Sequence, residues 1–570
     1  MKVFNVSLPL FLSLCFFAYG QGSDAVYFNG TILTMEDGQG TAQALAVKDG
    51  RITFVGSWDD AQEFITARTV RVDLHNGTLL PGFIDVHGHI TSAAGMIRAL
   101  DLAPSPYGRV NSISDLQAVL AEAVNQKGSG PTVPILGNGY DDAIMAEHRH
   151  PTRRELDAVS LSSPIMVVHA SGHASVANSA MLRLLDIPED VKDPEGGSYG
   201  RDSANVLNGK LEENACFEAL MKLTSFLPKD SAASGLPSDL EDFLRAQEQW
   251  LSFGQTTICD GRTMGVGLDL LRKAASMGLL KADVVYFPDY EANKSAQDDF
   301  AATHMRYENR LKFAGFKFSN DGSPQGKTAW LTQPYLIPPE GKGPDYRGFP
   351  IFSDERLYED LKAVFSKGIT AQLHVNGDAA IDQAIRVISR LKNEGYYVPG
   401  LRAALIHVQN SRPDHIAKIK EIGVIPSYFS SHVYLWGDWH YSSVLGPQRA
   451  SFISPANSAS KAGIIFTMHH DAPVTPPDLM TAVFSSVNRV TRSGRILGAD
   501  ERISVLEALK AITINAAYQI HEEGSKGSFK TGKLADMVIL DKNPLAMDPK
   551  DLRGVRVLET IKEGRTLYRR

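Results

Sequence analysis

The sequence predicts an α/β fold with three parts: a (β/α)8, TIM-like barrel, a β-sandwich formed from both termini, and a subdomain inserted after the first barrel strand. Three observations lead to this expectation. The middle of the chain alternates short apolar runs with amphipathic helical segments, the pattern of parallel βα units. Both ends consist of short strand-like runs broken by Gly and Asn. A stretch far longer than an ordinary loop separates the first two barrel strands, so it must hold structure of its own.

The composition is that of a globular protein with a large core. The chain has 570 residues, of which 43% are hydrophobic and 22% charged. A chain of this length can form more than one domain. Its net charge is −7 and it has no basic run, so we expect no nucleic acid partner.

The N-terminus has the features of a secretory signal peptide. Lys2 precedes an apolar run over residues 8–19, which ends in an A-x-G cleavage site at Gly20. The run is short for a transmembrane helix. We therefore expect residues 1–20 to be removed and the protein to be exported, to the periplasm or outside the cell, with no other membrane contact. A buried N-terminal strand is the alternative.

Two cysteines, Cys216 and Cys259, lie beyond this leader. An oxidising compartment would permit one disulfide between them, but two cysteines do not make a disulfide framework. The sequence favours two free, buried thiols and leaves the pairing open.

Residues 21–80 and 524–570 are expected to form one composite β-sandwich. Asp49-Gly50 separates two apolar runs and is a strong hairpin signal. The strand candidates lie at 25–28, 31–34, 44–48, 51–55 and 70–74 near the N-terminus, and at 535–540, 555–561 and 566–568 near the C-terminus.

Residues 81–523 are expected to form the barrel, interrupted by an insertion over about 95–250. One barrel strand leads to His87, and seven further candidates bring the number to the eight of a (β/α)8 barrel. These seven lie at 256–260, 282–287, 313–318, 370–374, 403–407, 424–428 and 464–469. The insertion carries a helical pattern over 116–124 and a strand over 165–170.

Helix start and stop signals lie between the barrel strands. Ser504 and Glu507 form a capping box ahead of an apolar helical pattern. Ser353 precedes a second such pattern, which Gly368 closes. A third begins after Ser411 and ends at Gly423.

His87-Gly88-His89 is the most informative stretch of the chain, because it predicts a metal site. It follows an apolar run and reads as the end of a strand. Alternate side chains of a strand face the same side, so the two imidazoles are expected to converge. Two neutral imidazoles on one face suit zinc or a similar ion.

Four later strands carry a polar group at or near their ends. In a barrel these groups meet at the carboxyl-terminal face, where active sites are built. A charged or imidazole group at the end of an apolar strand is costly to bury without a partner. These groups belong to Lys317, His374, His407 and Asp471.

Longer motifs around these residues resemble the metal-dependent amidohydrolase superfamily. They are closest to the branch of the N-substituted formamide deformylases, amidohydrolase family 3. The motifs are GFKFSNDG (315–322), HVNGDAA (374–380), LIHVQ (405–409), HHDAPVTPPD (469–478) and GSFKTGKLADMVILDKNPL (527–545). The insertion adds GNGYDD (137–142), PTRRELDAVS (151–160), HASGHASVANSAML (169–182) and NGKLEENA (208–215).

The resemblance implies a role for each polar group. His87 and His89 would hold one divalent metal, expected to be zinc, and His374 and His407 would hold a second. Lys317 would be N6-carboxylated and bridge the two metals. Asp471 would bind metal and serve as general base and acid. A single-metal site with an unmodified Lys317 is the alternative, because an ordinary lysine is cationic near neutral pH and a poor ligand.

One departure from the family pattern lies beside Asp471. Relatives often have Gly-Ser before this Asp, where this chain has His469-His470. Either imidazole could sit behind a ligand or contact the substrate, and a structural role is the expectation for both. Asp260 is expected to lie behind the ligands, with direct contact to the site as the alternative. Glu213 is expected to be structural, as a cap or as the partner of an Arg.

Four residues are candidates for binding the substrate. Tyr140 and His173 come from the insertion, and His432 and Trp436 from an aromatic-rich stretch after the seventh strand. That stretch could form a wall of the substrate pocket or pack the insertion onto the barrel. His432 is preferred over His440 as a pocket residue.

The resemblance implies a metal-dependent hydrolase that acts on C–N bonds other than peptide bonds. The expected substrate is a small molecule with a linear amide or N-formyl amide, cleaved by water that the metal activates. Cyclic amide, ester or deaminase chemistry is the first alternative. A catalytically silent binding or regulatory protein on the same scaffold is the second. The sequence leaves open whether the chain forms a homo-oligomer.

Overall fold

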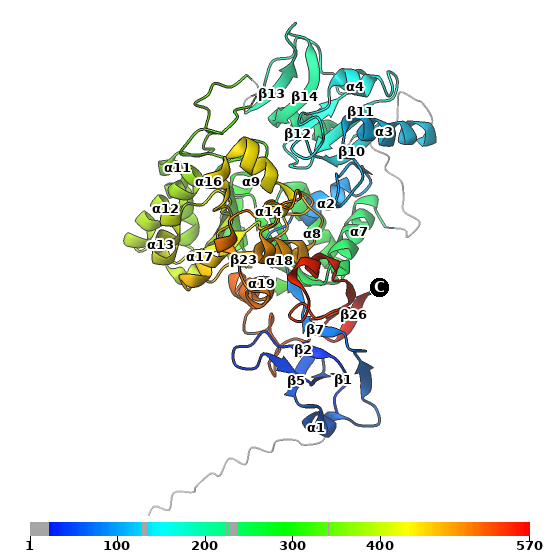
Figure 1. Cartoon of the computed structure of the whole chain (residues 1–570), viewed down its shortest axis with the longest axis vertical. Coiled ribbons are helices and arrows are strands. Elements are labelled where there is room, and N and C mark those ends of the chain that lie inside the picture. Colours follow the sequence, from blue (N-terminus) through cyan, green and yellow to red (C-terminus); the bar gives the residue numbers. More distant parts are fainter. Residues whose placement is uncertain (1–21, 128–133, 195, 224, 227–235, 340) are drawn as a thin grey trace, which may run out of the picture.

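The computed structural model describes residues 22–127, 134–194, 196–223, 225–226, 236–339 and 341–570 (Figure 1). The expected leader, residues 1–20, lies outside the described residues. Three regions follow one another along the long axis. The insertion strands lie at one end, the N-terminal strands at the other, and the barrel strands and helices between them. Among the described residues, no helix is long and apolar enough to cross a membrane.

Two parallel sheets form the middle region. The first contains β8 (Phe83–Ile84), β15 (Gln255–Thr263), β16 (Asp283–Pro288) and β18 (Leu311–Phe313), with β17 (Tyr307–Glu308) antiparallel at its edge. The second contains β19 (Gly315–Ser319), β20 (Thr370–Val375), β21 (Ala404–His407), β22 (Ile425–Tyr428) and β23 (Thr467–Met468). Within each sheet the parallel strands follow chain order, as βα units require. This is a TIM-barrel-like α/β arrangement.

Main-chain contacts link the two sheets at both edges. A single bridge joins Asp289, just beyond β16, to Lys317 of β19. At the other edge, Asp471 N donates to His87 O at 3.2 Å, and His89 N donates to Ala472 O at 2.7 Å. The segments that follow β8 and β23 therefore lie side by side.

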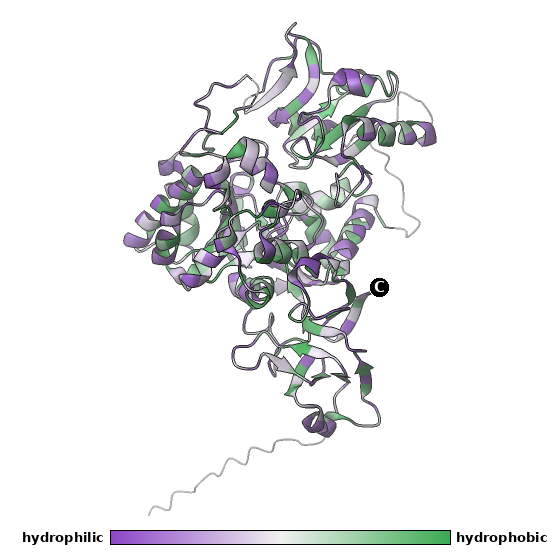
Figure 2. Ribbon diagram, in the orientation of Figure 1, coloured by the Kyte–Doolittle hydropathy of each residue, from purple (hydrophilic) through white to green (hydrophobic). Residues whose placement is uncertain are grey.

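Helices cover the outside of these strands. Among them are α8 (Gly265–Ser276), α11 (Asp354–Phe365), α12 (Asp378–Asn393), α13 (Pro413–Ile422), α18 (Leu479–Asn488) and α19 (Val505–Ala511). Outer helices such as α12 carry both hydrophilic and hydrophobic residues (Figure 2). Their apolar sides supply buried residues such as Ile388 and Leu361 to the main core, which they share with Leu373 and Leu405 of the strands.

The expected helix signals are confirmed. The Ser504 hydroxyl accepts from Glu507 N, and the Glu507 carboxylate accepts from the Ser504 backbone, which completes a capping box. Ser353 caps α11 by accepting a hydrogen bond from Arg356 N. Gly423 ends α13 with a φ of 78°, the left-handed region that glycine adopts without strain.

Three strand expectations are wrong in detail. The run over 313–318 is divided between β18 and β19, which belong to different sheets. The run over 464–469 contains only the two residues of β23. β8 ends at Ile84, so His87 and His89 follow the strand instead of belonging to it. The Asp85 carboxylate explains why the strand ends here. It accepts a hydrogen bond from His87 N at 3.0 Å, so this backbone amide is not available for pairing with a neighbouring strand.

Strands from both ends of the chain share one sheet. Its order is β26–β25–β24–β7–β2–β3, where β24 (Met537–Leu540) pairs with β7 (Thr78–Pro81). The other members are β25 (Val557–Lys562), β26 (Arg565–Arg569), β2 (Thr31–Leu33) and β3 (Thr41–Ala42). In Figure 1 the red C-terminal strand β26 lies beside the blue β7 region.

A second sheet, of N-terminal strands alone, packs against the same apolar cluster. Its order is β5–β4–β1–β6, from β5 (Arg51–Gly56), β4 (Ala44–Lys48), β1 (Ala25–Phe28) and β6 (Val70–Asp73). The Asp49-Gly50 hairpin is confirmed, with φ of 48° and 74° at the turn. Leu45 and Tyr27 of this sheet share a buried cluster with Leu79 and Met537 of the other.

The insertion has a sheet and a core of its own. The sheet order is β13–β14–β12–β11–β10–β9, from β9 (Leu100–Asp101), β10 (Ile135–Tyr140), β11 (Ile165–His169), β12 (Ala174–Ala177), β13 (Gly197–Arg201) and β14 (Leu207–Glu213). Helix α3 (Ile113–Lys127) covers it through Leu116 and Leu120, as the periodicity predicts. α2 (Ile90–Met96) leads into the insertion, and α7 (Ser238–Ser252) leads back to the barrel.

Both cysteines of the described chain are free and buried, the alternative that the sequence favours. Cys216 lies in α6 (Asn214–Leu223) of the insertion, and Cys259 lies in β15 of the barrel. Burial raises the pKa of the Cys216 thiol to about 11, so it is an unreactive, protonated side chain near neutral pH.

Candidate active site

The structure brings all six predicted metal ligands together at the carboxyl ends of the barrel strands. They reach this point from five different segments, which fold together only because the strands run parallel. The residues are His87 and His89 after β8, Lys317 in β19, His374 in β20, His407 at the end of β21, and Asp471 after β23.

Asp471 lies at the centre of one group of ligand atoms. Its Oδ1 is 3.1 Å from His89 Nε2 and 3.4 Å from His87 Nε2. The two rings are almost perpendicular, with centroids 5.0 Å apart. Lys317 Nζ lies 3.1 Å from His87 Nε2 and completes the group. One carboxylate and two imidazoles therefore aim ligand atoms at one point, as a small divalent ion requires.

His374 and His407 form a second group. Nδ1 of His374 lies 3.0 Å from Nε2 of His407. Two nitrogens that bind one tetrahedral zinc ion lie about 3.3 Å apart, since each is about 2.0–2.1 Å from the metal. The observed separation is close to that spacing.

In His87 and His374, the ring nitrogen that faces away from the ligand cluster lies within hydrogen-bond distance of an acceptor oxygen. Gln372 donates from Nε2 to Val86 O at 2.9 Å, which directs its Oε1 toward His87 Nδ1 at 3.0 Å. His87 Nδ1 must then carry the proton, and Nε2 presents a lone pair to the site. His374 Nε2 lies 3.2 Å from Gly322 O and 3.0 Å from Asn376 Nδ2, and when it donates to the carbonyl its Nδ1 is left as a lone pair. Such outer hydrogen bonds fix the tautomer of metal-binding histidines.

These donors fit a metal. His374 Nδ1 presents a lone pair to His407 Nε2, and such a pair must either share a proton or hold a cation between its nitrogens. The second choice suits a site of buried, neutral imidazoles beside an ionised carboxylate. The donor set of nitrogens and one carboxylate is the set that zinc prefers in catalytic sites.

Charges within the site reinforce one another. Burial by itself raises the pKa of the Asp471 carboxyl, but attraction from His407, His89 and His87 outweighs it and holds the pKa well below its usual range. Burial lowers the pKa of Lys317 to about 7, so a large share of this amine is neutral at neutral pH. Burial, helped by the nearby Lys317, lowers the pKa of His374 to about 3 and keeps that ring neutral.

The backbone is strained where the ligands attach. His407 has a φ of 75°, Val408 a φ of 46° and Asp471 a φ of 56°. A β-branched residue such as Val408 rarely adopts a positive φ. Strain of this kind costs about 1–3 kcal/mol per residue and is found mostly at functional sites.

His469 is part of the site, although the sequence predicts only a structural role for it. Its ring is fully buried and packs against the rings of His407 and His87, with centroids 5.0 and 5.2 Å apart. Its neighbour His470 points elsewhere, toward Asp85 and Gln255 at 3.4 and 3.3 Å, and is structural as expected. Two adjacent histidines after one strand look alike in sequence, so only the fold separates them.

The four predicted substrate contacts lie at different depths. His173 is partly exposed and donates from Nδ1 to Glu213 Oε2 at 2.8 Å. His432 and Trp436 are almost fully buried, with ring centroids 4.5 Å apart. Tyr140 is completely buried in the core of the insertion and hydrogen bonds to His150. His173 is thus the most accessible of the four.

Asp260 and Glu213 support neighbouring elements. The buried Asp260 carboxylate accepts from Thr91 N and Oγ1, both at 3.0 Å, and so steadies the first turn of α2 next to His89. Glu213, which has a φ of 49°, accepts a hydrogen bond from His173 Nδ1 at 2.8 Å. Both agree with the supporting roles expected from the sequence.

Two further clusters of ionisable groups are explained by charge pairing. In the insertion, His169 Nε2 lies 3.0 Å from Asp142 Oδ1 and 3.8 Å from Asp141 Oδ1. On the outer barrel surface, Arg412 neutralises Asp382 and Asp414, at 2.8 and 3.0 Å.

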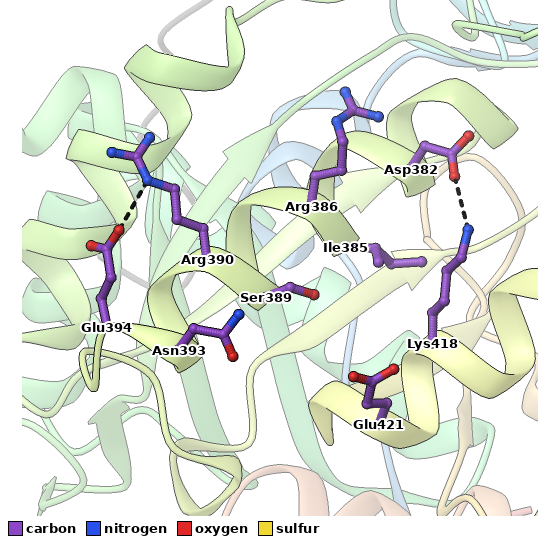
Figure 3. Close-up of a pocket in the computed structure, with 9 residues that line it drawn as sticks. All are labelled: Asp382, Ile385, Arg386, Ser389, Arg390, Asn393, Glu394, Lys418 and Glu421. Carbon is purple, nitrogen blue, oxygen red and sulfur yellow. Dashed lines mark hydrogen bonds and ion pairs between the residues drawn. The ribbon is translucent and has the colours of Figure 1, made fainter.

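A surface hollow of about 650 Å³ lies away from the strand ends, between α12 and α13 (Figure 3). Its charged side chains pair with one another: Arg390 with Glu394 at 3.1 Å and Lys418 with Asp382 at 3.9 Å. None of the six predicted ligands lines it. The candidate active site is therefore the ligand cluster and not this hollow.

Comparison with known proteins places this chain in a family. A model of the amidohydrolase family matches residues 71–568. The chain belongs to the amidohydrolase family. It is a hydrolase that acts on carbon–nitrogen bonds, and the resemblance predicted from its motifs is confirmed.

Individual relatives cover about three quarters of the chain or more. N-substituted formamide deformylase of Arthrobacter pascens is 25% identical over 96% of this chain and 99% of its own. Exoenzymes regulatory protein AepA of Pectobacterium carotovorum is 27% identical over 73% and 86%. A solved structure of an uncharacterized metal-dependent hydrolase from Pyrococcus horikoshii has a TM-score of 0.71 and 24% identity, over 92% and 99%. This last similarity bears on the fold alone.

Proposed function

We propose that this amidohydrolase cleaves a linear amide or N-formyl amide of a small molecule at the ligand cluster. The convergence of the Asp471 carboxylate with His87 and His89, at 3.4 and 3.1 Å, carries the proposal. The similarity to N-substituted formamide deformylase over nearly the full length supports the substrate class.

The ligand set would hold one or two divalent ions, with zinc as the expected metal. His87, His89 and Asp471 would hold one, and His374 with His407 the other. Such ions, when bound, polarise the amide carbonyl and lower the pKa of water.

Asp471 would move the proton. Its carboxyl is ionised because its pKa lies well below the usual range, so it can accept a proton from the attacking water. Returning that proton to the nitrogen lets the amine leave as a neutral molecule. Its position against both imidazoles holds the carboxylate in place for this double role.

Lys317 would be carboxylated. A pKa of about 7 leaves much of its amine neutral, and a neutral amine can attack carbon dioxide. A new N–C bond forms, one proton leaves the nitrogen, and the product is an anionic carbamate. This step turns a poor, cationic ligand into an oxygen ligand that can bridge two ions. An unmodified Lys317 would leave a single-metal site.

The substrate would enter from the insertion side. His173 is the best placed of the four predicted contacts, since it is partly exposed and held by Glu213. His432 lies beside Phe429, whose ring packs against His469 at 5.3 Å, so His432 and Trp436 would shape the wall next to the metal. Tyr140 would contribute to substrate binding from within the insertion.

The domain organisation and export are also proposals. The links between Asp289 and Lys317, and between Asp471 and His87, support one closed eight-stranded barrel in which β18 and β19 count as one bent strand. The sheet shared by both termini supports a composite sandwich of residues 21–80 and 524–570. The separate sheet over 100–213 supports an insertion over about 95–250. Residues 1–20 would direct export.

The function is tested with wild-type protein and the Asp471→Asn variant against a substrate panel. The panel contains aromatic and aliphatic N-substituted formamides, linear amides, cyclic amides, esters and amino-substituted rings. We expect wild type to release amine and carboxylate from the first two classes, and the variant to lose this turnover. Release of ammonia from rings alone would favour a deaminase. Ligand binding without turnover in both proteins would favour a regulatory protein, as the name of the Pectobacterium relative suggests.

A further inference from the structure

We propose that His469 is a positioning residue that sets the tautomer of His407 and so directs the Nε2 lone pair of His407 toward a metal. This inference rests on the proposed function, because it concerns the same metal ligands.

Three buried groups form an unbroken chain behind the site. His407 Nδ1 lies 3.0 Å from His469 Nε2, and His469 Nδ1 lies 3.0 Å from Ser427 Oγ. His469 and Ser427 are fully buried, and His407 is 3% exposed. Solvent therefore does not compete for these hydrogen bonds, and each ring nitrogen must find its partner within the chain.

The proton positions along this chain have two consistent arrangements. In the first, Ser427 donates to His469, His469 donates from Nε2 to His407, and His407 Nε2 donates to His374 Nδ1. In the second, the two bonds behind His407 are reversed: His407 Nδ1 donates to His469 Nε2, and His469 Nδ1 donates to Ser427, so that His407 Nε2 no longer donates to His374. Both contain the same number of protons, because a serine hydroxyl can either donate or accept.

Only the second arrangement frees His407 Nε2 for a metal. His374 has a backbone acceptor for its outer nitrogen, because Nε2 lies 3.2 Å from Gly322 O, and donation to that carbonyl leaves Nδ1 as a lone pair. His407 lacks such a backbone acceptor at Nδ1 among the described residues, and its Nδ1 partner is His469. His469 can switch from donor to acceptor without gaining a charge, so a metal can be taken up without removing a proton from the buried chain.

The chain supplies variants that separate this role from simple packing. His469→Gln keeps an acceptor oxygen near the position of Nε2, whereas His469→Leu keeps volume and removes the acceptor. His470→Gln is the matched control, because His470 is equally buried but bonds to Asp85 and Gln255 and does not touch His407.

The test is metal retention, measured per chain by elemental analysis after dialysis against increasing chelator in bicarbonate buffer. Loss of such a partner typically weakens metal binding by about 10–100-fold. We expect His469→Leu to lose one of two metals at a chelator concentration about 10–100-fold lower than wild type requires. His469→Gln and His470→Gln should stay within about threefold of wild type. A second measurement needs no variant. Nitrogen NMR of the zinc-loaded wild-type protein, with its histidines isotopically labelled, should show that the His469 ring is protonated at Nδ1.

Two results would overturn the inference alone. One is a metal-loaded wild type whose His469→Leu variant holds both metals as tightly. The other is a zinc-loaded wild type with His469 protonated at Nε2, which decides the matter even if His469→Leu does not fold. A wild-type protein that binds no metal would overturn the proposed function, and this inference with it.

Discussion

The indole of Trp436 donates a hydrogen bond of 2.6 Å from Nε1 to Asp141 Oδ2, although 295 positions separate the two residues. Trp436 follows α14 (Ser431–Leu435) on the barrel, and Asp141 follows β10 in the insertion. Both are almost completely buried, so the bond joins the insertion to the barrel in a site without solvent. The insertion is therefore held next to the wall that packs against the candidate metal ligands.

Replacing Trp436 by Phe tests this joint. The change leaves the Asp141 carboxylate without its indole donor, and losing a hydrogen bond to a charged group costs about 1.5–3 kcal/mol. We expect thermal unfolding at a lower temperature and faster hydrogen exchange over 141–150. Trp439→Phe is the matched control, because Trp439 Nε1 donates to a neutral carbonyl, Gln325 O, at 3.1 Å. Equal losses in the two variants would contradict a special role for the bond to Asp141.

Asp471→Asn is expected to remove catalysis and keep the fold. The amide fits the same space but cannot accept the proton, so kcat should fall by about 10²–10⁴-fold. Circular dichroism and thermal unfolding check that the fold survives. Asp260→Asn gives the contrast, since that carboxylate supports α2 through Thr91 and its loss should reduce stability more than kcat. Near-normal turnover in Asp471→Asn would remove Asp471 from the mechanism.

A network of buried charges at the opposite end of the barrel is expected to be essential for stability. Asp283 lies 2.5 Å from Lys526, 2.7 Å from Lys562 and 2.9 Å from Arg310, and both lysines are buried. Asp283→Asn leaves these cations without their shared partner, which costs about 3–5 kcal/mol. Chemical denaturation measures the loss. Glu122→Gln, which breaks the exposed pair with Arg109, should cost less than about 1 kcal/mol.

His169 makes the stability of the insertion depend on pH. Burial alone lowers the pKa of this imidazole, but Asp141 and Asp142 outweigh burial and raise the pKa to about 9. The unfolded value is about 6.5. Protonated His169 therefore stabilises the fold fully below about pH 6.5, and this contribution is lost as the pH rises through about 9. His169→Gln should reduce the difference between the unfolding temperatures measured at pH 6.5 and at pH 9. If the variant kept the same pH dependence of the unfolding temperature, groups other than His169 would be responsible for it.

Much of the candidate site could be predicted from the sequence because parallel strands deliver their ends to one face. His374 and His407 lie at the ends of β20 and β21, where apolar runs stop at a polar residue. The same logic located Lys317 and Asp471. The prediction that His87 and His89 belong to a strand is wrong. The strand ends because His87 N donates to the Asp85 side chain, and a hydrophobic pattern does not reveal such a bond.

What the sequence could not supply are contacts between distant segments. Nothing in the pattern distinguishes His469 from His470, and only the packing of β21 and β22 brings His469 against His407 and Ser427. The bond between Trp436 and Asp141 likewise has no local signal. The strand-like run over 313–318 is divided because its two halves pair with different sheets, which hydrophobicity alone does not reveal.

The central claim is that the strand ends form a metal centre, and metal content per chain tests it most directly. The protein is purified in the presence of bicarbonate and zinc, dialysed without chelator, and analysed for bound metal beside mass spectrometry of Lys317 under gentle conditions. The account predicts two metals per chain and a carboxylated Lys317. A folded protein that retains no stoichiometric metal would contradict it.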